Sequence, residues 1–307
     1  MSFKLPDQPS PQADVHELAD FAELWAWKRR QVSVREILGY LGRIDENDFN
    51  EGCDDSDDIN ADLLDETMNE VERRSTACGS GYPFLLTEAG TVLRHQDEKN
   101  ERSSVYNYLL LSTRMNMKAN RSHGGIDGAG LLEEISAFTI RNYLGADRCK
   151  SIVFGTARAG GFKEKIEDLC KRIGEGGGFR HMDPGAVQAN DDKLDTVAWI
   201  PFSDKLPGKL VVFGQCKTGS SWDAQKTQLQ PDAFIKLWMR EGFVVDPMRA
   251  FFVSEAVDRS HWRRHGLYAG LFFDRCRIVD CSDSIDPSLI SNIENWNTAA
   301  IGSVSIG

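Results

Sequence analysis

The sequence predicts an α+β protein in two parts: a mostly helical accessory domain over residues 1–122 and a mixed domain of helices and strands over residues 123–307. Three observations predict this organisation. Apolar residues recur at helical spacing through much of the first part. A polar, glycine-rich segment at 118–130, KANRSHGGIDGAG, then interrupts that spacing and marks a domain boundary. Beyond it the order becomes helix, strands, helix, strand.

The first part begins with a proline-containing tail over residues 1–11, where we expect no regular structure. The spacing of apolar residues then predicts helices over 14–42, 60–74 and 104–117. Ser33 fits an N-cap within the first of these stretches, because Glu36 follows at the spacing of a capping box. Two short strands are expected within 82–95, on either side of a turn at 88–90.

The second part predicts a longer series of elements. Helices are expected over 131–144, 162–173, 223–240 (with a proline break) and 258–268. Strands are expected over 151–156, 195–202, 209–217 and 251–255, and a last strand or strand pair over 271–280. Gly145 suits the end of the first of these helices. The tail after residue 282 has little periodicity, so no element is predicted there.

Composition narrows the class of protein. Apolar residues make up 41% of the chain and charged residues 27%, which is ordinary for a globular protein that can bury a core. No apolar run is long enough to span a membrane, and the N-terminus lacks the apolar segment of a signal peptide. The seven cysteines are scattered and include no CxxC pair, which predicts reduced thiols and a cytoplasmic location.

The net charge of −11 is concentrated in the N-terminal part. Residues 1–120 hold 13 Lys and Arg against 23 Asp and Glu, whereas residues 121–307 hold 23 against 24. The second part is therefore nearly neutral and can present a local basic face to a phosphate backbone. The most acidic stretch, DENDFNEGCDDSDD at 45–58, is expected to be a solvated loop; docking of a protein partner or mimicry of DNA is the alternative.

The most informative pattern is Asp195 followed by Gln215-Cys216-Lys217. If the two flanking runs form a hairpin centred near residue 206, Asp195 lies opposite Lys217. Residues two apart on a strand share a face, so Asp195, Gln215 and Lys217 then project to one side and Cys216 to the other. Three polar side chains on one face of an otherwise apolar hairpin are costly to bury, so they point to a functional site.

The trio suits hydrolysis of a phosphodiester. Magnesium prefers oxygen ligands, so Asp195 would supply an anionic ligand and Gln215 its neutral amide oxygen. Lys217 would orient or help deprotonate the attacking water and would offset charge on the phosphorus. The expected cofactor is therefore Mg²⁺ or Mn²⁺.

These residues resemble the PD-(D/E)XK superfamily of restriction-endonuclease-like proteins, and more closely its Mrr-like branch, which carries a D…QxK signature. The matching segments are Leu194–Val197, Gly214–Lys217 and Leu132–Ile135, the last with a helix glutamate after a large apolar residue. Leu194 stands where the superfamily name has proline. The likeness covers about residues 126–280. It implies an αβββαβ core and Mg²⁺-dependent cleavage of DNA, in a setting of bacterial defence against foreign DNA, including that of viruses.

Glutamine at position 215 removes one negative charge from the metal site, so a second carboxylate is needed. The resemblance favours Glu133 as this ligand, whereas the helical wheel brings Glu134 nearer the apolar face of the same helix. Asp191 and Asp192, just before the strand, are further candidates.

Some residues near this pattern could contact DNA. Trp222 could stack on a base, with core packing as the alternative. The stretch RSHWRRH at 259–265 is cationic, and it could contact phosphates or form an ordinary solvated helix face. Its arginines are Arg259, Arg263 and Arg264. His261 and His265 suit a surface or phosphate contact better than a metal site, because no third ligand is nearby.

Together these features predict a metal-dependent deoxyribonuclease whose catalytic residues are Asp195, Gln215, Lys217 and Glu133. No nucleotide-binding motif is present, and cutting both strands needs two active centres or two visits. We therefore expect a protein partner, such as an ATPase or helicase subunit, or a homo-oligomer. The alternative is a non-catalytic interaction subunit in which a degenerate nuclease fold docks a protein partner. The neutral Gln215 keeps that alternative open.

Overall fold

A computed structural model describes residues 3–10, 13–40, 55–87, 90–97, 100–182 and 191–304. Most of the acidic stretch predicted as a loop, residues 45–54, lies outside these ranges. Its last residues are helical instead, because helix α3 begins at Asp55. Within the described ranges, no helix is both long and apolar enough to cross a membrane.

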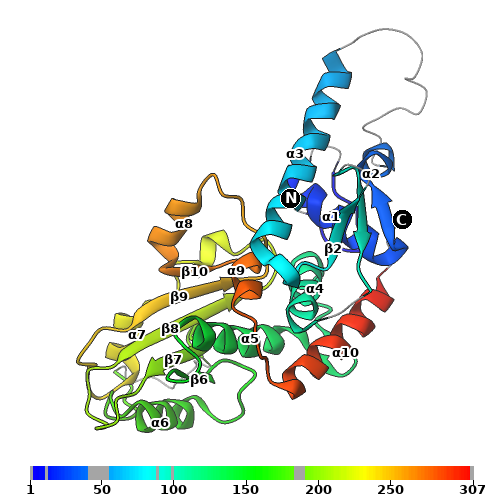
Figure 1. Cartoon of the computed structure of the whole chain (residues 1–307). Helices are drawn as coiled ribbons and strands as arrows, with labels where there is room; N and C mark the ends of the chain where they lie inside the picture. Colours follow the sequence, from blue (N-terminus) through cyan, green and yellow to red (C-terminus); the bar gives the residue numbers. More distant parts are fainter. Residues whose placement is uncertain are drawn as a thin grey trace.

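The N-terminal part combines helices with a small antiparallel sheet of order β1-β3-β2 (Figure 1). Its elements are α1 (Val15–Arg29), β1 (Gln31–Ser33), α2 (Val34–Tyr40), α3 (Asp55–Cys78), β2 (Phe84–Thr87), β3 (Val92–His95) and α4 (Glu101–Arg114). The strand pair predicted within 82–95 is confirmed, because β2 and β3 pair antiparallel. The capping box is also confirmed: the Glu36 amide donates to Ser33 Oγ over 3.1 Å, and the Ser33 amide donates to the Glu36 carboxylate over 2.7 Å. The stretch predicted as helical over 14–42 forms two helices, α1 and α2, and the short strand β1 between them was not predicted. Arg30 takes a φ of 76°, and the chain then pairs with β3 as β1.

The C-terminal part contains a five-stranded mixed sheet of order β10-β9-β8-β7-β6. Strands β6, β7 and β8 pair antiparallel, and β8, β9 and β10 pair parallel. The strands are β6 (Lys150–Val153), β7 (Thr196–Ile200), β8 (Leu210–Lys217), β9 (Met248–Val253) and β10 (Leu271–Phe273). The helices are α5 (Gly128–Tyr143), α6 (Phe162–Ile173), α7 (Pro231–Trp238), α8 (Trp262–Ala269), α9 (Arg275–Asp280) and α10 (Pro287–Ser303). A short β4–β5 pair (Ser122–His123 with Ile126–Asp127) precedes α5.

The sheet lies between two apolar layers. Alternate residues of β7 and β8, such as Ala198 and Val212, pack in the same core cluster as the buried face of α5. The intervening residues, such as Val197 and Phe213, pack with α6 and α7 on the opposite face. This alternation follows from the period of two along a strand. Helix α5 runs beside β6, β7 and β8 (Figure 1).

The predicted β7–β8 hairpin is confirmed, with a two-residue correction to its register. Thr196 pairs with Gly214 and Val197 with Phe213, so the turn is centred on residue 205 rather than 206. Lys205 lies at this centre in a left-handed conformation, with a φ of 61°. Continuing the register sets Asp195 opposite Gln215 instead of Lys217. A shift of two residues leaves every side chain on its predicted face.

Two predictions for the C-terminal region are wrong. The strand expected through residue 280 ends at Phe273, and α9 follows because buried Asp274 caps it by accepting from the Arg277 amide over 3.1 Å. The tail expected to lack an element forms α10, whose N-cap is Asp286. Its buried apolar residues are spaced four, three and four apart, which is the spacing of one helix face. They are Leu289, Ile293, Trp296 and Ala300.

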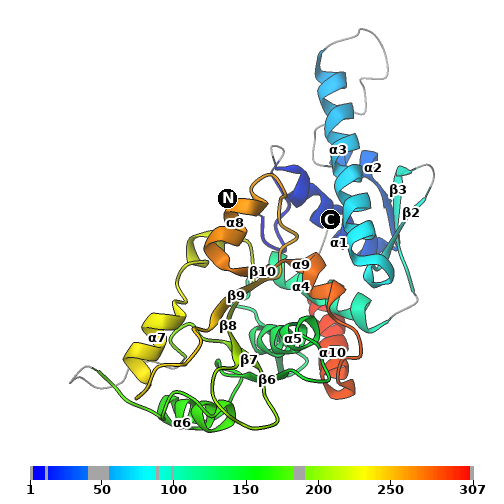
Figure 2. The ribbon, with the colours of Figure 1, turned by 60° about the vertical axis from the view of Figure 1, so that its left-hand side comes forward.

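Helix α10 returns to the N-terminal part and packs along α4 (Figures 1 and 2). The Asn297 side chain donates to the Ser104 carbonyl of α4 over 2.8 Å. The division into two domains near residue 122 stays a prediction. Helix α10, which lies in the second part of the sequence, contacts both α4 of the first part and α5 of the second.

A buried ion network also connects the two parts. Asp20 of α1 accepts from Arg74 of α3 (2.7 Å), Arg114 of α4 (2.7 Å) and Arg275 of α9 (2.8 Å). None of these four side chains is more than 1% exposed. Burial alone would raise the pKa of Asp20, but the three guanidinium groups hold it well below its ordinary value. Tyr82 and Tyr106 are bonded to the neighbouring carboxylate of Glu23, which completes the network.

Candidate active site

Asp195 is held by backbone hydrogen bonds on both sides, immediately before β7. Its carbonyl accepts from the amides of Phe154 (2.8 Å) and Gly155 (2.9 Å), and its own amide donates to the Gly214 carbonyl (2.9 Å). Its side chain is 7% exposed, and Oδ2 accepts from the Cys216 amide over 2.8 Å. The carboxylate is therefore fixed against the start of the Gln215-Cys216-Lys217 segment.

The environment of Asp195 opposes its ionisation. Burial raises the pKa of this carboxyl to about 7, and the nearby charges of Glu133 and Asp191 add to the rise. The Cys216 amide and the Lys217 ammonium act in the opposite direction but do not cancel it. A carboxyl with such a pKa would be favoured in its charged form by an added cation.

Gln215 lies in the interior of β8, on the same face as Phe213 and opposite to Cys216. Phe251 of β9 is its neighbour across the parallel pair. The side chain is fully buried, and neither Oε1 nor Nε2 has a hydrogen-bond partner among the described residues. A buried amide in that state costs about 1–3 kcal/mol. A water molecule, a cation or a ligand group at this position would satisfy it.

Glu133 projects from α5 toward the loop after β6. Its carboxylate accepts from the Thr156 amide (3.1 Å), the Thr156 hydroxyl (2.8 Å) and the Ala157 amide (2.9 Å). It packs so closely on Gly155 that a Cβ there would lie 2.5 Å from Glu133 Oε2. Because the Gly155 amide also bonds to Asp195, this loop brings Glu133 beside Asp195. Burial raises the pKa of Glu133 despite these hydrogen bonds.

The other candidate carboxylates lie differently. Glu134 is half-buried, and its pKa is raised by burial and by Glu133. Asp191 is close enough to raise the pKa of both Asp195 and Glu133. Asp192 is directed elsewhere, because its Oδ2 accepts from Trp238 Nε1 of α7 over 2.6 Å. Asp191 is thus the upstream aspartate nearer to the site.

Two lysines belong to the same neighbourhood. Lys217 is half-buried at the end of β8, and its charge lowers the pKa of Asp195. Lys165 of α6 is 4% exposed and donates to the Gly155 carbonyl over 2.7 Å. Burial lowers the pKa of Lys165, while Asp191 and Glu133 oppose that change. The sequence analysis missed Lys165, since nothing in its helical spacing distinguishes it from a solvated charge.

The donor set is chemically suited to a hard cation. Asp195 and Glu133 offer carboxylate oxygens and Gln215 an amide oxygen, which are the ligand types Mg²⁺ and Mn²⁺ accept. In the described part of the chain, no group of three or more His, Cys, Asp or Glu is gathered as metal ligands usually are. Asp195 and Glu133 are only two carboxylates, and the third oxygen ligand here would be the amide of Gln215. The unpartnered Gln215 amide is the feature that fits a cation.

Trp222 is a core residue in this structure. It is 4% exposed, its Nε1 donates to Glu255 Oε2 over 2.5 Å, and its ring packs against Phe251 and Phe272. These contacts favour the core-packing alternative over stacking on a base.

The three arginines considered as DNA contacts, in and just before α8, differ in their exposure. Arg259 lies over the Trp262 ring at 4.2 Å and pairs with Asp274 over 3.2 Å, whereas Arg263 and Arg264 are exposed. His265 faces inward, with its Nδ1 3.3 Å from Asp223 and its ring against Trp222, and exposed His261 is bonded to Ser260. The two histidines therefore have separate partners.

Comparisons of the chain with models of protein families, with curated proteins and with solved structures found no match. The function is therefore inferred from the residues of the site.

Proposed function

We propose that the protein is a metal-dependent phosphodiesterase that cleaves DNA, with an active centre of Asp195, Gln215, Lys217 and Glu133. The buried Gln215 amide carries this proposal, because no described residue satisfies it and it shares a strand face with Asp195 and Lys217. Apart from α6, which is inserted between β6 and β7, the succession α5, β6, β7, β8, α7, β9 follows the αβββαβ order of a restriction-endonuclease-like core, and this supports the proposal.

Each residue has a distinct task in this proposal. Asp195 and Gln215 would hold the cation through their side-chain oxygens, and Glu133 would approach from α5 to supply the second negative charge. Bound Mg²⁺ or Mn²⁺ would supply positive charge at the scissile phosphate. Lys217 would orient the attacking water and stabilise the charge that develops on the phosphate oxygens. Gly155 must lack a side chain, because a Cβ would displace the Glu133 carboxylate.

The test is cleavage of supercoiled plasmid by the purified chain in Mg²⁺, Mn²⁺ or EDTA. We expect nicked or linear product with either metal and none in EDTA. Lys217→Ala should lower the rate by about 10²-fold or more, because it removes a group that acts at the transition state. Lys236→Ala is the matched control, since Lys236 is an exposed lysine of α7 whose partner is Asp232. Full cleavage by a folded Lys217→Ala variant would contradict the assignment.

One observation favours the rival function, a non-catalytic interaction subunit. The Glu133 carboxylate already accepts three hydrogen bonds from Thr156 and Ala157, so its burial does not require a metal. Calorimetric titration with Mn²⁺ separates the two proposals. A nuclease should bind the ion and lose binding on Asp195→Asn, whereas an interaction subunit should release no heat of binding in either form.

A further inference from the structure

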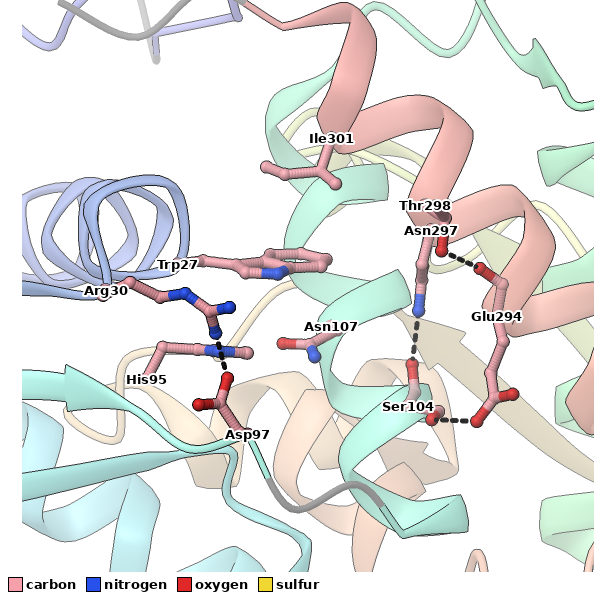
Figure 3. A pocket seen from close by; sticks show the side chains of 10 residues that line it. All are labelled: Trp27, Arg30, His95, Asp97, Ser104, Asn107, Glu294, Asn297, Thr298 and Ile301. Atoms are coloured by element: carbon pink, nitrogen blue, oxygen red, sulfur yellow. Dashed lines mark hydrogen bonds and ion pairs between the residues drawn. The ribbon is translucent and has the colours of Figure 1, made fainter.

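A polar cavity lies between α1, β3, α4 and α10, which carry none of the candidate active-site residues (Figure 3). Its volume is about 470 Å³, within the range of small-molecule sites. Its principal lining residues are Trp27, His95, Asn107, Glu294 and Asn297. The proposed nuclease function uses none of them.

One wall of the cavity is flat and aromatic. The rings of Trp27 and His95 are stacked, with centroids 5.6 Å apart and planes inclined by 13°. Trp27 is half-buried, so part of its surface is accessible from the cavity. At the edge, Arg30 is paired with Asp97, and each of these side chains is more than half exposed. A planar ligand could pack on the indole there.

The opposite side offers hydrogen-bond acceptors. Asn297 donates through Nδ2 to the Ser104 carbonyl over 2.8 Å, which orients its amide. In the part of the chain that the structure describes, Asn297 Oδ1 has no partner, although the residue is only 5% exposed. Glu294 accepts from the Ser104 hydroxyl over 3.1 Å and brings a carboxylate to the same side.

Asn107 of α4 completes the set. Figure 3 shows its amide directed into the space between the Trp27–His95 pair and Asn297. The residue is 4% exposed, and its Oδ1 lacks a partner among the described residues. Two buried amide oxygens without a donor among the described residues are unfavourable unless a ligand or water satisfies them.

We propose that this cavity binds a small molecule bearing a guanidinium group. A guanidinium is planar, carries five N–H donors and no acceptor, and stacks on aromatic faces. It therefore matches Trp27, the oxygens of Asn107 and Asn297, and the carboxylate of Glu294. The charge of the cavity also favours a cation. Arg30 and Asp97 form an ion pair, so the carboxylate of Glu294 is the charge left without a counter-ion among the lining residues. A neutral nucleobase is the competing ligand, since it would stack as well, but it has fewer N–H donors than a guanidinium and no positive charge to pair with Glu294.

The experiment is calorimetric titration of the full chain with L-arginine, agmatine, L-citrulline and adenosine. Citrulline is the matched ligand control, because a neutral ureido oxygen replaces one N–H₂ group of the guanidinium. We expect arginine and agmatine to bind at least about tenfold more tightly than citrulline. Citrulline lacks the charge-assisted hydrogen bond to Glu294, and its ureido oxygen would face the acceptor oxygens of the cavity. Preferential binding of adenosine, or binding of none of the four, would overturn the proposal.

Two variants connect the binding to the cavity. Asn107→Leu has nearly the same shape and removes an unsatisfied buried amide, so it should abolish binding without lowering the Tm. Glu294→Gln should weaken binding about tenfold or more, because the ligand loses its counter-charge while Ser104 keeps an acceptor. Asn292→Ala, an exposed position on the same helix, is the control and should bind normally. Unchanged arginine affinity in Asn107→Leu would refute the assignment to this cavity.

Discussion

Replacing Asp195 with Asn would measure the charge imbalance of the candidate active site. The pKa of Asp195 is about 7 in the folded protein, against an ordinary value of 3.8. A carboxyl whose pKa rises on folding has no cost below the unfolded value, and it destabilises the fold increasingly as the pH rises to the folded value. The difference between 3.8 and about 7 corresponds to about 4 kcal/mol. Asparagine has nearly the same shape and does not ionise.

Urea unfolding in EDTA at pH 4, 6 and 8 is the assay. The Asp195→Asn variant should match the parent protein at pH 4 and exceed its free energy of unfolding by up to about 4 kcal/mol at pH 8. Adding Mn²⁺ at pH 8 should stabilise the parent protein and not the variant, because a ligand that binds only the folded state raises stability. Equal or lower stability of the variant at pH 8 would refute the reasoning.

Asp168→Asn supplies a control of opposite sign. Partial burial opposes the effect, but Arg158 and Arg172 lower the pKa of Asp168. A carboxylate of this kind stabilises the fold above its unfolded pKa, and this contribution is lost as the pH falls through the folded pKa. Its replacement should therefore lower stability at pH 8, where Asp195→Asn raises it.

Two further predictions concern the helix carboxylate and the buried ion network. Glu133→Gln should strongly impair metal-dependent cleavage of plasmid, whereas Glu134→Gln should retain most of it; the reverse order would identify Glu134 as the ligand. Asp20→Asn should lower the free energy of unfolding by about 3–5 kcal/mol in urea, because three arginines lose their buried counter-charge. Asp232→Asn, at an exposed position, should change stability little, and an equally mild effect of Asp20→Asn would contradict the structural role of the network.

The hairpin and its polar face could be predicted from the sequence because both depend on local alternation. Strand period fixes which side chains share a face, so the relation of Asp195, Gln215 and Lys217 did not depend on the turn. The predicted register was wrong by two residues. The turn is centred on Lys205, which takes a left-handed conformation, and the sequence has no glycine at that position to indicate it.

Other features could not be predicted, because they depend on contacts between distant segments. Asp20 and Arg275 are 255 residues apart in the chain, and neither lies in a recognisable motif. Helix α10 has buried residues at helical spacing, but Ser, Asn and Thr between them weaken the periodic signal. Trp222 follows the β8 strand in sequence, and its burial against Phe251 depends on the parallel pairing of β8 with β9.

The neutral residue at position 215 gains a physical reason from the surroundings of Asp195. In sequence alone, glutamine looks like a lost metal ligand. In the fold, Glu133 and Asp191 already raise the pKa of Asp195, so a third buried carboxylate would add repulsion whenever the cation is absent. An amide oxygen can ligate without that cost.

This interpretation predicts that Gln215→Glu destabilises the protein without metal and strengthens its binding of Mn²⁺. Without metal at pH 8, the variant should unfold at lower urea concentration than the parent protein, because a buried charge joins Asp195 and Glu133. With Mn²⁺ it should bind the ion more tightly and remain active, because the new carboxylate becomes a ligand. Calorimetry and plasmid cleavage measure the second effect. A variant that folds but loses both metal binding and cleavage would show that the amide nitrogen of Gln215, and not its oxygen, serves the site.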